Sequence, residues 1–274
     1  MQTIKLGACV RLDWINYNNE IAKHIEEDDI NNFTKWPIVS NTMHYNDSQG
    51  GDSHGAFDYL RGLPDWDKWK EAVREVPEGN PTPNQWYPLS SDHMIHQADH
   101  LARFLSRTSC KLTDLKAIYE FGAGYGSMCR LIHNLGFSGK YVIIDLPAVQ
   151  ALQKWYLERT VKQVRITYTL DSNEFTEQME DDSLFIATWS LSEVPYALRD
   201  TILRAVLEKV NYVLIAFQGY HDELDNLDYF LNAAQQWSPQ YRWDAVAVPN
   251  KITNRPDHFY LFGEILEETL LCRQ

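Results

Sequence analysis

Cysteine is scarce in this chain of 274 residues, and no long hydrophobic run is present. The four cysteines, Cys9, Cys110, Cys129 and Cys272, are scattered, and none belongs to a CxxC pair. We therefore expect reduced thiols and no disulfide framework. The sequence shows neither a secretory hydrophobic segment near its start nor an apolar run long enough to span a bilayer. These features predict a cytoplasmic protein with no membrane partner.

The chain also has few positively charged residues relative to its acidic ones. The chain has 25 Lys and Arg residues against 38 Asp and Glu residues, a formal net charge of −13, and we find no basic cluster. An acidic surface repels phosphate backbones, so we expect no nucleic-acid partner. Aromatic residues are plentiful, which suits binding of a carbohydrate or a flat ring but equally suits core packing. The sequence gives no indication of the oligomeric state.

The character of the sequence changes near residue 110. Before that point, turn-forming residues dominate segments 46–55 and 77–88, and short amphipathic segments such as 66–76 lie between and after them. We predict that residues 1–110 form a helical, loop-rich cap that covers an acceptor pocket. After residue 115, apolar runs alternate with helical segments, which is typical of a parallel sheet. Residues 111–274 are therefore predicted to form the cofactor-binding catalytic domain.

Seven strands are expected in the second part of the chain. The predicted fold is a doubly wound α/β fold with a Rossmann-like sheet. Its strands are expected at 117–121, 141–144, 164–170, 184–189 and 212–217, with a closing antiparallel hairpin at 241–248 and 258–263. Helices are expected at 127–135, from 147, at 195–209 and at 224–237.

A glycine-rich turn follows the first of these strands. Glu120 precedes the sequence GAGYG at residues 122–126, and glycines there let a ligand approach the backbone closely. Asp145 ends the second strand, where a carboxylate can accept hydrogen bonds from a ribose diol. The cofactor-binding residues that we predict are Glu120, Gly122, Ala123, Gly124, Tyr125, Gly126, Asp145, Leu146, Asp171, Thr188, Trp189 and Ser190.

The spacing of the glycines decides between two cofactors. A dinucleotide fingerprint, G-x-G-x-x-G, would need its third glycine at position 127, which is Ser127. The carboxylate of Glu120 would repel a pyrophosphate, but it suits the amino-acid end of S-adenosylmethionine. The turn therefore favours S-adenosylmethionine over a nicotinamide cofactor. A glycine turn without any ligand remains an alternative.

The segment after the fourth strand bears on the acceptor. Enzymes of this fold that methylate amines often carry a [DNS]-P-P-[YFW] element there, and residues 187–195 lack it. This absence favours an oxygen acceptor. Glu193 could be a general base or a substrate clamp, or simply a carboxylate that favours the dipole of the following helix.

Two groups of histidines are candidates for the acceptor site. His221 follows the fifth strand and is our first choice as general base, oriented by Asp222 or Glu193, although it could be an exposed loop histidine. His93, His96 and His100 lie at helical spacing after a capping Ser91 or Asp92. They could hold a metal, line the acceptor pocket or form a polar face.

Several motifs resemble the sugar O-methyltransferase family. They are residues 118–131 (IYEFGAGYGSMCRL), 141–147 (YVIIDLP), 152–157 (LQKWYL), 188–193 (TWSLSE) and 258–263 (HFYLFG), with Trp36-Pro37, Thr42-Met43 and 94–101 (MIHQADHL) upstream. The resemblance thus runs from about residue 36 to residue 263. It departs from the family at Ala123, where the family pattern has glycine, and an alanine is tolerated there if its φ is negative.

The resemblance implies a class I methyltransferase fold, S-adenosylmethionine as cofactor and S-adenosylhomocysteine as product. The implied reaction is methyl transfer to the hydroxyl of a nucleotide-linked or glycan-bound sugar. The acceptor contacts that we expect are His96, Gln97, His100, Gln218 and Tyr220. Asp222 and Asp225 could supply oxygen ligands to a divalent cation, but we do not expect a metal. Alternatives are a methyltransferase for another small molecule, a non-catalytic protein that binds S-adenosylmethionine, and a dinucleotide-dependent oxidoreductase.

Overall fold

The computed structural model describes residues 12–44, 52–162, 165–249 and 256–266. Seven strands form one sheet in the order β3-β2-β1-β4-β5-β9-β8. The strands are β1 (Ala117–Phe121), β2 (Lys140–Ile144), β3 (Arg165–Thr169), β4 (Ser183–Thr188), β5 (Tyr212–Gln218), β8 (Tyr241–Pro249) and β9 (Pro256–Ile265). Strands β1 to β5 run parallel to one another, and β9 is antiparallel to both β5 and β8. The predicted seven-stranded, doubly wound sheet with its closing hairpin is confirmed.

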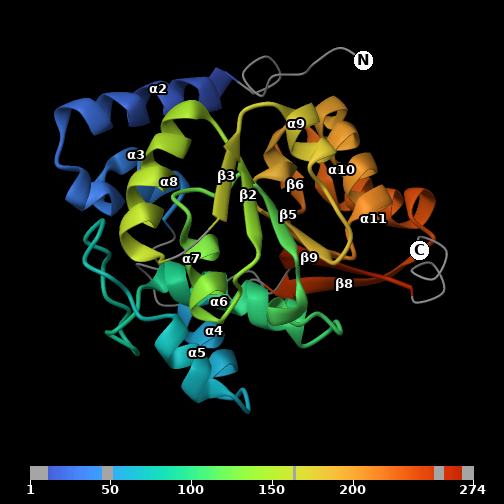
Figure 1. Cartoon of the computed structure of the whole chain (residues 1–274), viewed down its shortest axis with the longest axis horizontal. Coiled ribbons are helices and arrows are strands. Elements are labelled where there is room, and N and C mark those ends of the chain that lie inside the picture. Colours follow the sequence, from blue (N-terminus) through green and yellow to red (C-terminus); the bar gives the residue numbers. More distant parts are fainter. Residues whose placement is uncertain (1–11, 45–51, 163–164, 250–255, 267–274) are drawn as a thin grey trace.

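Helices cover both faces of this sheet (Figure 1). One face carries α7 (Ser127–Asn134) and α8 (Pro147–Thr160), and the other carries α9 (Ser172–Glu177), α10 (Tyr196–Lys209) and α11 (Asn226–Trp237). Because side chains alternate along a strand, Ile118 of β1 is buried in one hydrophobic core and Tyr119 in the other. The chain leaves β1 toward β2 on one side and returns to β4 on the other. The boundary between β1 and β4 is therefore the switch point at which ligands bind in such sheets.

The N-terminal part packs on the face that carries α7 and α8. It consists of α2 (Leu12–Glu27), η1 (Ile30–Lys35), α3 (Pro37–Thr42), α4 (Asp52–Arg61), α5 (Trp66–Ala72), α6 (Asp92–Leu105) and η2 (Leu112–Asp114). Phe33 and Met94 are buried in the same core as Ile118. In addition, Nη1 of the buried Arg130 on α7 lies 2.9 Å from Oε2 of Glu75. The N-terminal part is thus helical, as predicted, while its treatment as a separate domain stays a prediction.

Three local expectations differ from the structure. The helix expected from residue 224 begins at Asn226, because β6 (Tyr220–His221) and β7 (Leu224–Asp225) form a small hairpin and the Asp225 side chain accepts from the Asp228 N–H. The short helix α9 was not predicted. The histidines of α6 do not form an exposed polar face, because His93 and His100 are buried.

The expectations about cysteines and membrane spans can be compared with the structure only for the described residues. Cys110 and Cys129 are free and buried, whereas Cys9 and Cys272 lie outside the described residues, as do residues 46–51 of the first predicted turn segment. Among the helices described, none is long and apolar enough to cross a membrane.

Candidate functional site

The glycine turn between β1 and α7 has the backbone conformation that its sequence predicts. Gly122, Gly124 and Gly126 have φ values of +70°, +56° and +98°, whereas Ala123 does not have a positive φ. A Cβ atom on Gly122 would lie 2.3 Å from Cβ of Ser190, so no larger residue fits there. Glycine is therefore required at this position both by conformation and by space. Alanine is acceptable at position 123, as expected.

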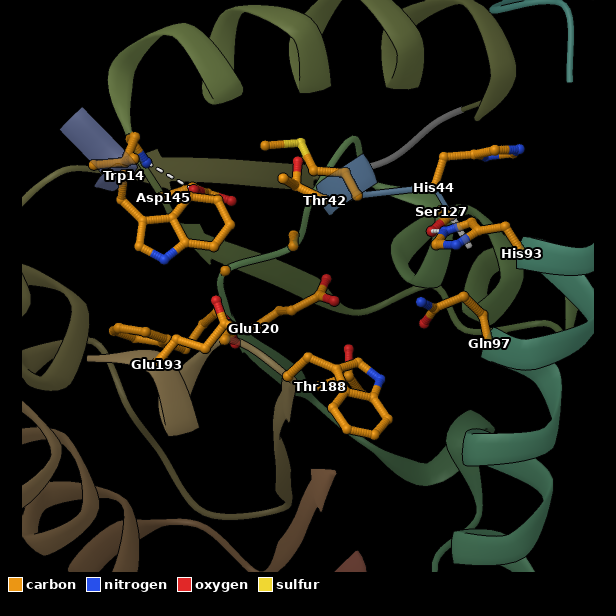
Figure 2. Close-up of a pocket in the computed structure, with 18 of the residues that line it drawn as sticks. Trp14, Thr42, His44, His93, Gln97, Glu120, Ser127, Asp145, Thr188 and Glu193 are labelled. Atoms are coloured by element: carbon orange, nitrogen blue, oxygen red, sulfur yellow. Dashed lines mark hydrogen bonds between the residues drawn. The ribbon is translucent and has the colours of Figure 1, made fainter. Parts of the chain in front are cut away.

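A cavity of about 690 Å³ opens beside this turn, at the carboxyl ends of β1, β2, β4 and β5. Figure 2 shows Trp14 and Asp145 at one end of it and His44, His93 and Ser127 at the other, with Thr42 across from Glu193 and Thr188. Its lining residues come from the N-terminal part and from the sheet alike, and they are Trp14, Ser40, Asn41, Thr42, Met43, His44, His93, His96, Gln97, Glu120, Phe121, Gly122, Ala123, Gly124, Ser127, Ile144, Asp145, Leu146, Thr188, Trp189, Ser190, Glu193, Val194, Gln218 and His258.

Asp145 is held firmly at the end of β2. Its Oδ1 accepts from the Leu146 N–H at 2.8 Å, and its Oδ2 accepts from Nε2 of Gln153 at 2.8 Å. Burial raises the pKa of Asp145 to about 7, although these hydrogen bonds act in the opposite direction. The carboxylate is thus oriented and poorly solvated, and hydroxyl or ammonium donors from a ligand would stabilise its charged form.

Glu120 is a second carboxyl group in the wall of the cavity, and it is fully buried whereas Asp145 is partly buried. Tyr141 donates its hydroxyl to Oε2 of Glu120 at 2.7 Å. Burial raises the pKa of Glu120 to about 8, and the nearby charge of Asp145 contributes to the increase. Near neutral pH, a cationic group placed in the cavity would therefore displace a proton from Glu120.

The far end of the cavity contains two neutral histidines. Nε2 of His93 lies 2.7 Å from Oγ of Ser127, the first residue of α7, and the His44 and His93 rings are 5.2 Å apart. Burial lowers the pKa of His44 to about 4 and that of His93 well below its usual value. Nδ1 of His44 and Oε1 of Gln97 are buried without a hydrogen-bond partner. Buried polar atoms are rarely left in this state, so both atoms point to a polar ligand group at this end.

Trp189 occupies an unusual backbone conformation directly after β4. Its φ is +66°, which is uncommon for a bulky residue and is found mostly at functional sites. Its Nε1–H donates to Nε2 of His100 at 3.3 Å, and Nδ1 of His100 contacts the Tyr260 hydroxyl at 2.6 Å. Since Nε2 of His100 accepts, the proton of this ring is on Nδ1. His100 therefore contacts Trp189 by a hydrogen bond but does not itself line the cavity.

Glu193 and Gln218 lie together in the cavity wall. Nε2 of Gln218 is 3.4 Å from Oε1 of Glu193 and 3.1 Å from Nδ1 of His221. Because Gln218 donates to Nδ1, the neutral His221 ring carries its proton on Nε2. His221 is not among the lining residues, so it meets the cavity only through Gln218.

The structure brings most of the sequence-predicted site residues to this cavity. Those that line it are Glu120, Gly122, Ala123, Gly124, Asp145, Leu146, Thr188, Trp189, Ser190, Glu193, His96, Gln97 and Gln218. Those outside the lining are Tyr125, Gly126, Asp171, His100, Tyr220, His221 and Asp222.

The outlying residues have other structural roles. Tyr125 is buried among aromatic rings, and Asp171 caps α9 by accepting from the Asn173 and Glu174 backbone N–H groups. Tyr220 is 70% exposed, so it points away from any pocket. Asp222 occupies the β6–β7 turn with a φ of +51°.

Several lining residues had no functional role in our sequence analysis. Trp14, residues 40–44, Ser127 and His258 reach the cavity from distant parts of the chain. The family-like segments Thr42-Met43, 118–131 and HFYLFG drew attention to parts of this set. His93, a candidate metal or pocket residue in the sequence analysis, lines the cavity as well. Within the described residues, no group of three or more His, Cys, Asp or Glu side chains is arranged to hold a metal ion.

No protein-family model and no curated protein sequence matches this chain. Solved structures with a related fold include several methyltransferases. Magnesium protoporphyrin IX methyltransferase from Synechocystis, with bound S-adenosylmethionine, is 12% identical, with 78% of this chain and 97% of that chain covered and a TM-score of 0.47. An rRNA methylase from Streptococcus thermophilus is 16% identical, with coverages of 64% and 96% and a TM-score of 0.46. A precorrin-6y C5,15-methyltransferase from Geobacter metallireducens is 15% identical, with coverages of 70% and 97% and a TM-score of 0.45. Similarity at this level does not identify an acceptor for this chain.

Proposed function

We propose that this protein is an S-adenosylmethionine-dependent O-methyltransferase whose acceptor is a sugar hydroxyl. The observation that carries the cofactor assignment is the cavity itself, in which the open G-x-G-x-G backbone faces the carboxyl groups of Glu120 and Asp145. S-adenosylmethionine carries a sulfonium and an ammonium group. Both charges suit a cavity whose lining includes Glu120, Asp145 and Glu193.

The residues of the cavity fit the parts of this cofactor. Asp145 is oriented to accept from the ribose hydroxyls, as its place at the end of β2 predicts. Glu120 and the unpartnered Oε1 of Gln97 are acceptors for the ammonium group. Ser127, the first residue of α7, is a donor for a carboxylate, which the helix N-terminus also favours, and His93 of α6 is hydrogen-bonded to its Oγ.

The acceptor side is proposed from the remaining lining residues. Trp189, His96 and His258 supply ring surfaces, and Gln218 and Glu193 supply polar groups that can bind hydroxyls. The resemblance to sugar O-methyltransferases, together with the missing amine-methylation element, supports a nucleotide-linked or glycan-bound sugar. The cytoplasmic location and the absence of a nucleic-acid partner remain predictions from the sequence.

When bound, the cofactor supplies an activated methyl group for in-line displacement. The protein must then align the acceptor oxygen, exclude water and remove the hydroxyl proton. We propose Glu193 as the base, since its side chain reaches the cavity and Gln218 lies against its Oε1. His221 was our first choice from the sequence. Its place outside the lining, with Nδ1 accepting from Gln218, makes it the weaker candidate.

Two measurements test this proposal. The first is calorimetric titration with S-adenosylmethionine, S-adenosylhomocysteine and NADH, in which we expect binding of the first two only. Binding of NADH alone would contradict the cofactor assignment. The second is methyl transfer from labelled S-adenosylmethionine to a panel of nucleotide sugars, simple glycosides and non-sugar alcohols. Turnover confined to the non-sugar alcohols would keep the methyltransferase and reject the sugar acceptor.

A further inference from the structure

Arg199 of α10 is a fully buried cation close to the candidate base, with an exposure of 0%. Its Nε donates to the Val194 carbonyl at 2.7 Å, and its Nη2 donates to the Ser192 carbonyl. These two carbonyls belong to the residues on either side of Glu193. The guanidinium therefore holds the backbone at both sides of Glu193, the last residue of the short 3-10 helix η3 (Leu191–Glu193) after β4.

The third donor nitrogen of Arg199, Nη1, contacts a different segment, the one after β5. Nη1 donates to Oδ1 of Asn226 at 2.7 Å, and Nδ2 of Asn226 donates to the Gln218 carbonyl at 2.9 Å. The Asn226 backbone N–H also donates to the Gly219 carbonyl at 2.9 Å. Arg199 thus links the segment after β4 to the segment after β5. These segments carry the neighbouring side chains of Glu193 and Gln218.

Three aromatic rings surround the guanidinium. Its central carbon lies 5.0 Å from the ring centre of Tyr196, 5.2 Å from that of Tyr229 and 5.6 Å from that of Phe230. Such rings favour a cation electrostatically and confine its planar group. The planar fork presents donors in several fixed directions, which the single ammonium of a lysine does not reproduce. The hydrogen bonds from Nε, Nη1 and Nη2 to three different acceptors therefore require arginine at this position.

We propose that Arg199 is a positioning residue that holds Glu193 and Gln218 in place for proton removal from the acceptor. This inference rests on the proposed function of the cavity. Arg199 is not among the residues that line the cavity, so it acts only through the two loops. Misplacing a reacting group by about 1 Å can cost on the order of a hundredfold in rate.

The test compares Arg199→Lys and Arg199→Met with Arg204→Lys, a control on an exposed position of the same helix. Turnover is measured with whichever acceptor the panel identifies, and cofactor affinity is measured by calorimetry. For the Arg199 variants we expect the turnover number to fall about tenfold to a hundredfold, with the dissociation constant for S-adenosylmethionine within about twofold of the parent. The control should change neither quantity. Parent-like turnover of Arg199→Lys would overturn the proposal.

Hydrogen–deuterium exchange of the full chain tests, without an acceptor, whether Arg199 holds the segments after β4 and β5 together; we call this link the clamp. In the Arg199 variants, peptides that cover 190–194 and 218–226 should exchange faster, while those that cover 117–126 should not change. Asn226→Ala removes only the link to the second loop, so exchange should rise in 218–226 and not in 190–194. Unchanged exchange in both loops would reject the clamp. If the parent protein does not bind S-adenosylmethionine, the proposed function fails, and this measurement still decides whether Arg199 holds the loops.

Discussion

At the scale of single residues, the two carboxyl groups of the cavity wall, Glu120 and Asp145, lead to a measurable prediction about cofactor binding. The pKa of Glu120 is raised to about 8 and that of Asp145 to about 7, so both are partly protonated near neutral pH. A bound cation requires their charged forms. Binding should therefore release protons at pH 7, and affinity should increase as the pH rises from 6 to 8.

Calorimetry at pH 7 in buffers with different ionisation enthalpies measures this proton release directly. Glu120→Gln cannot release a proton, so the release should decrease, and affinity should fall about tenfold to a hundredfold because a charge-assisted contact is lost. A binding enthalpy that is independent of the buffer would contradict the assigned role of Glu120.

The glycine turn offers a matched pair of substitutions. Gly122→Ala places a methyl group 2.3 Å from Cβ of Ser190 at a φ of +70°. We expect a loss of roughly 1–3 kcal/mol in the free energy of unfolding, with weakened cofactor binding. Ala123→Gly restores the glycine of the family pattern at a position without positive φ, so cofactor binding should hardly change. Thermal unfolding and calorimetry of both variants check this, and equal effects would show that the turn is not constrained at Gly122.

At the scale of elements, the loop after β4 and the β6–β7 hairpin carry the two candidate bases. Glu193→Gln removes the base but keeps the amide contact with Gln218, so turnover should fall about a hundredfold or more. His221→Gln changes a residue outside the cavity, and a fall of less than about tenfold is expected because only the support of Gln218 is altered. Cofactor affinity is the control in both cases. A larger loss from His221→Gln would restore the histidine as base.

The sheet and its flanking helices could be predicted because their apolar periods are long and unambiguous. Ile118 and its neighbours form a buried run, and Pro147 marks the start of α8. Helix α9 escaped prediction because it has only 6 residues and depends on the cap from Asp171. The histidines of α6 were open to several interpretations, since their burial depends on packing against α7 and the sheet. Such contacts between distant segments leave no local pattern in a sequence.

In the candidate site, too, the residues with a local sequence pattern could be predicted, and those brought in by distant contacts could not. The glycine turn, Asp145 and the segment after β4 follow directly from strand ends and were predicted. His44 and Trp14 were not, because nothing near them in the sequence indicates that they meet the glycine turn.

At the scale of the whole molecule, residues of the N-terminal part line both the proposed cofactor end and the proposed acceptor end of the cavity. Met43 lies beside Gly124, where an added Cβ would be 3.7 Å from the Met43 Cβ. Our sequence analysis expected this part to cover the acceptor pocket. Deleting residues 1–90 should therefore abolish binding of S-adenosylmethionine as well as acceptor turnover.

The deletion also exposes the core that Phe33 and Tyr125 share, so folding must be checked. The milder variant Met43→Asp tests the same contact in the full chain, with Glu26→Ala, at an exposed position outside the cavity lining, as its control. Calorimetry should show a cofactor affinity reduced about tenfold for Met43→Asp, because a charge is placed on an apolar contact. Unchanged affinity would mean that the N-terminal part contributes to acceptor binding and not to cofactor binding.

The cavity wall runs from Trp14 to His258, so its first and last members are separated by almost the whole chain. During synthesis, β9 leaves the ribosome after the other strands that the structure describes, and it must insert between β5 and β8. A nascent chain that ends before β9 lacks His258 and the Tyr260 contact behind Trp189. If the cavity binds S-adenosylmethionine as proposed, the ligand would selectively stabilise molecules in which β9 has already inserted into the sheet.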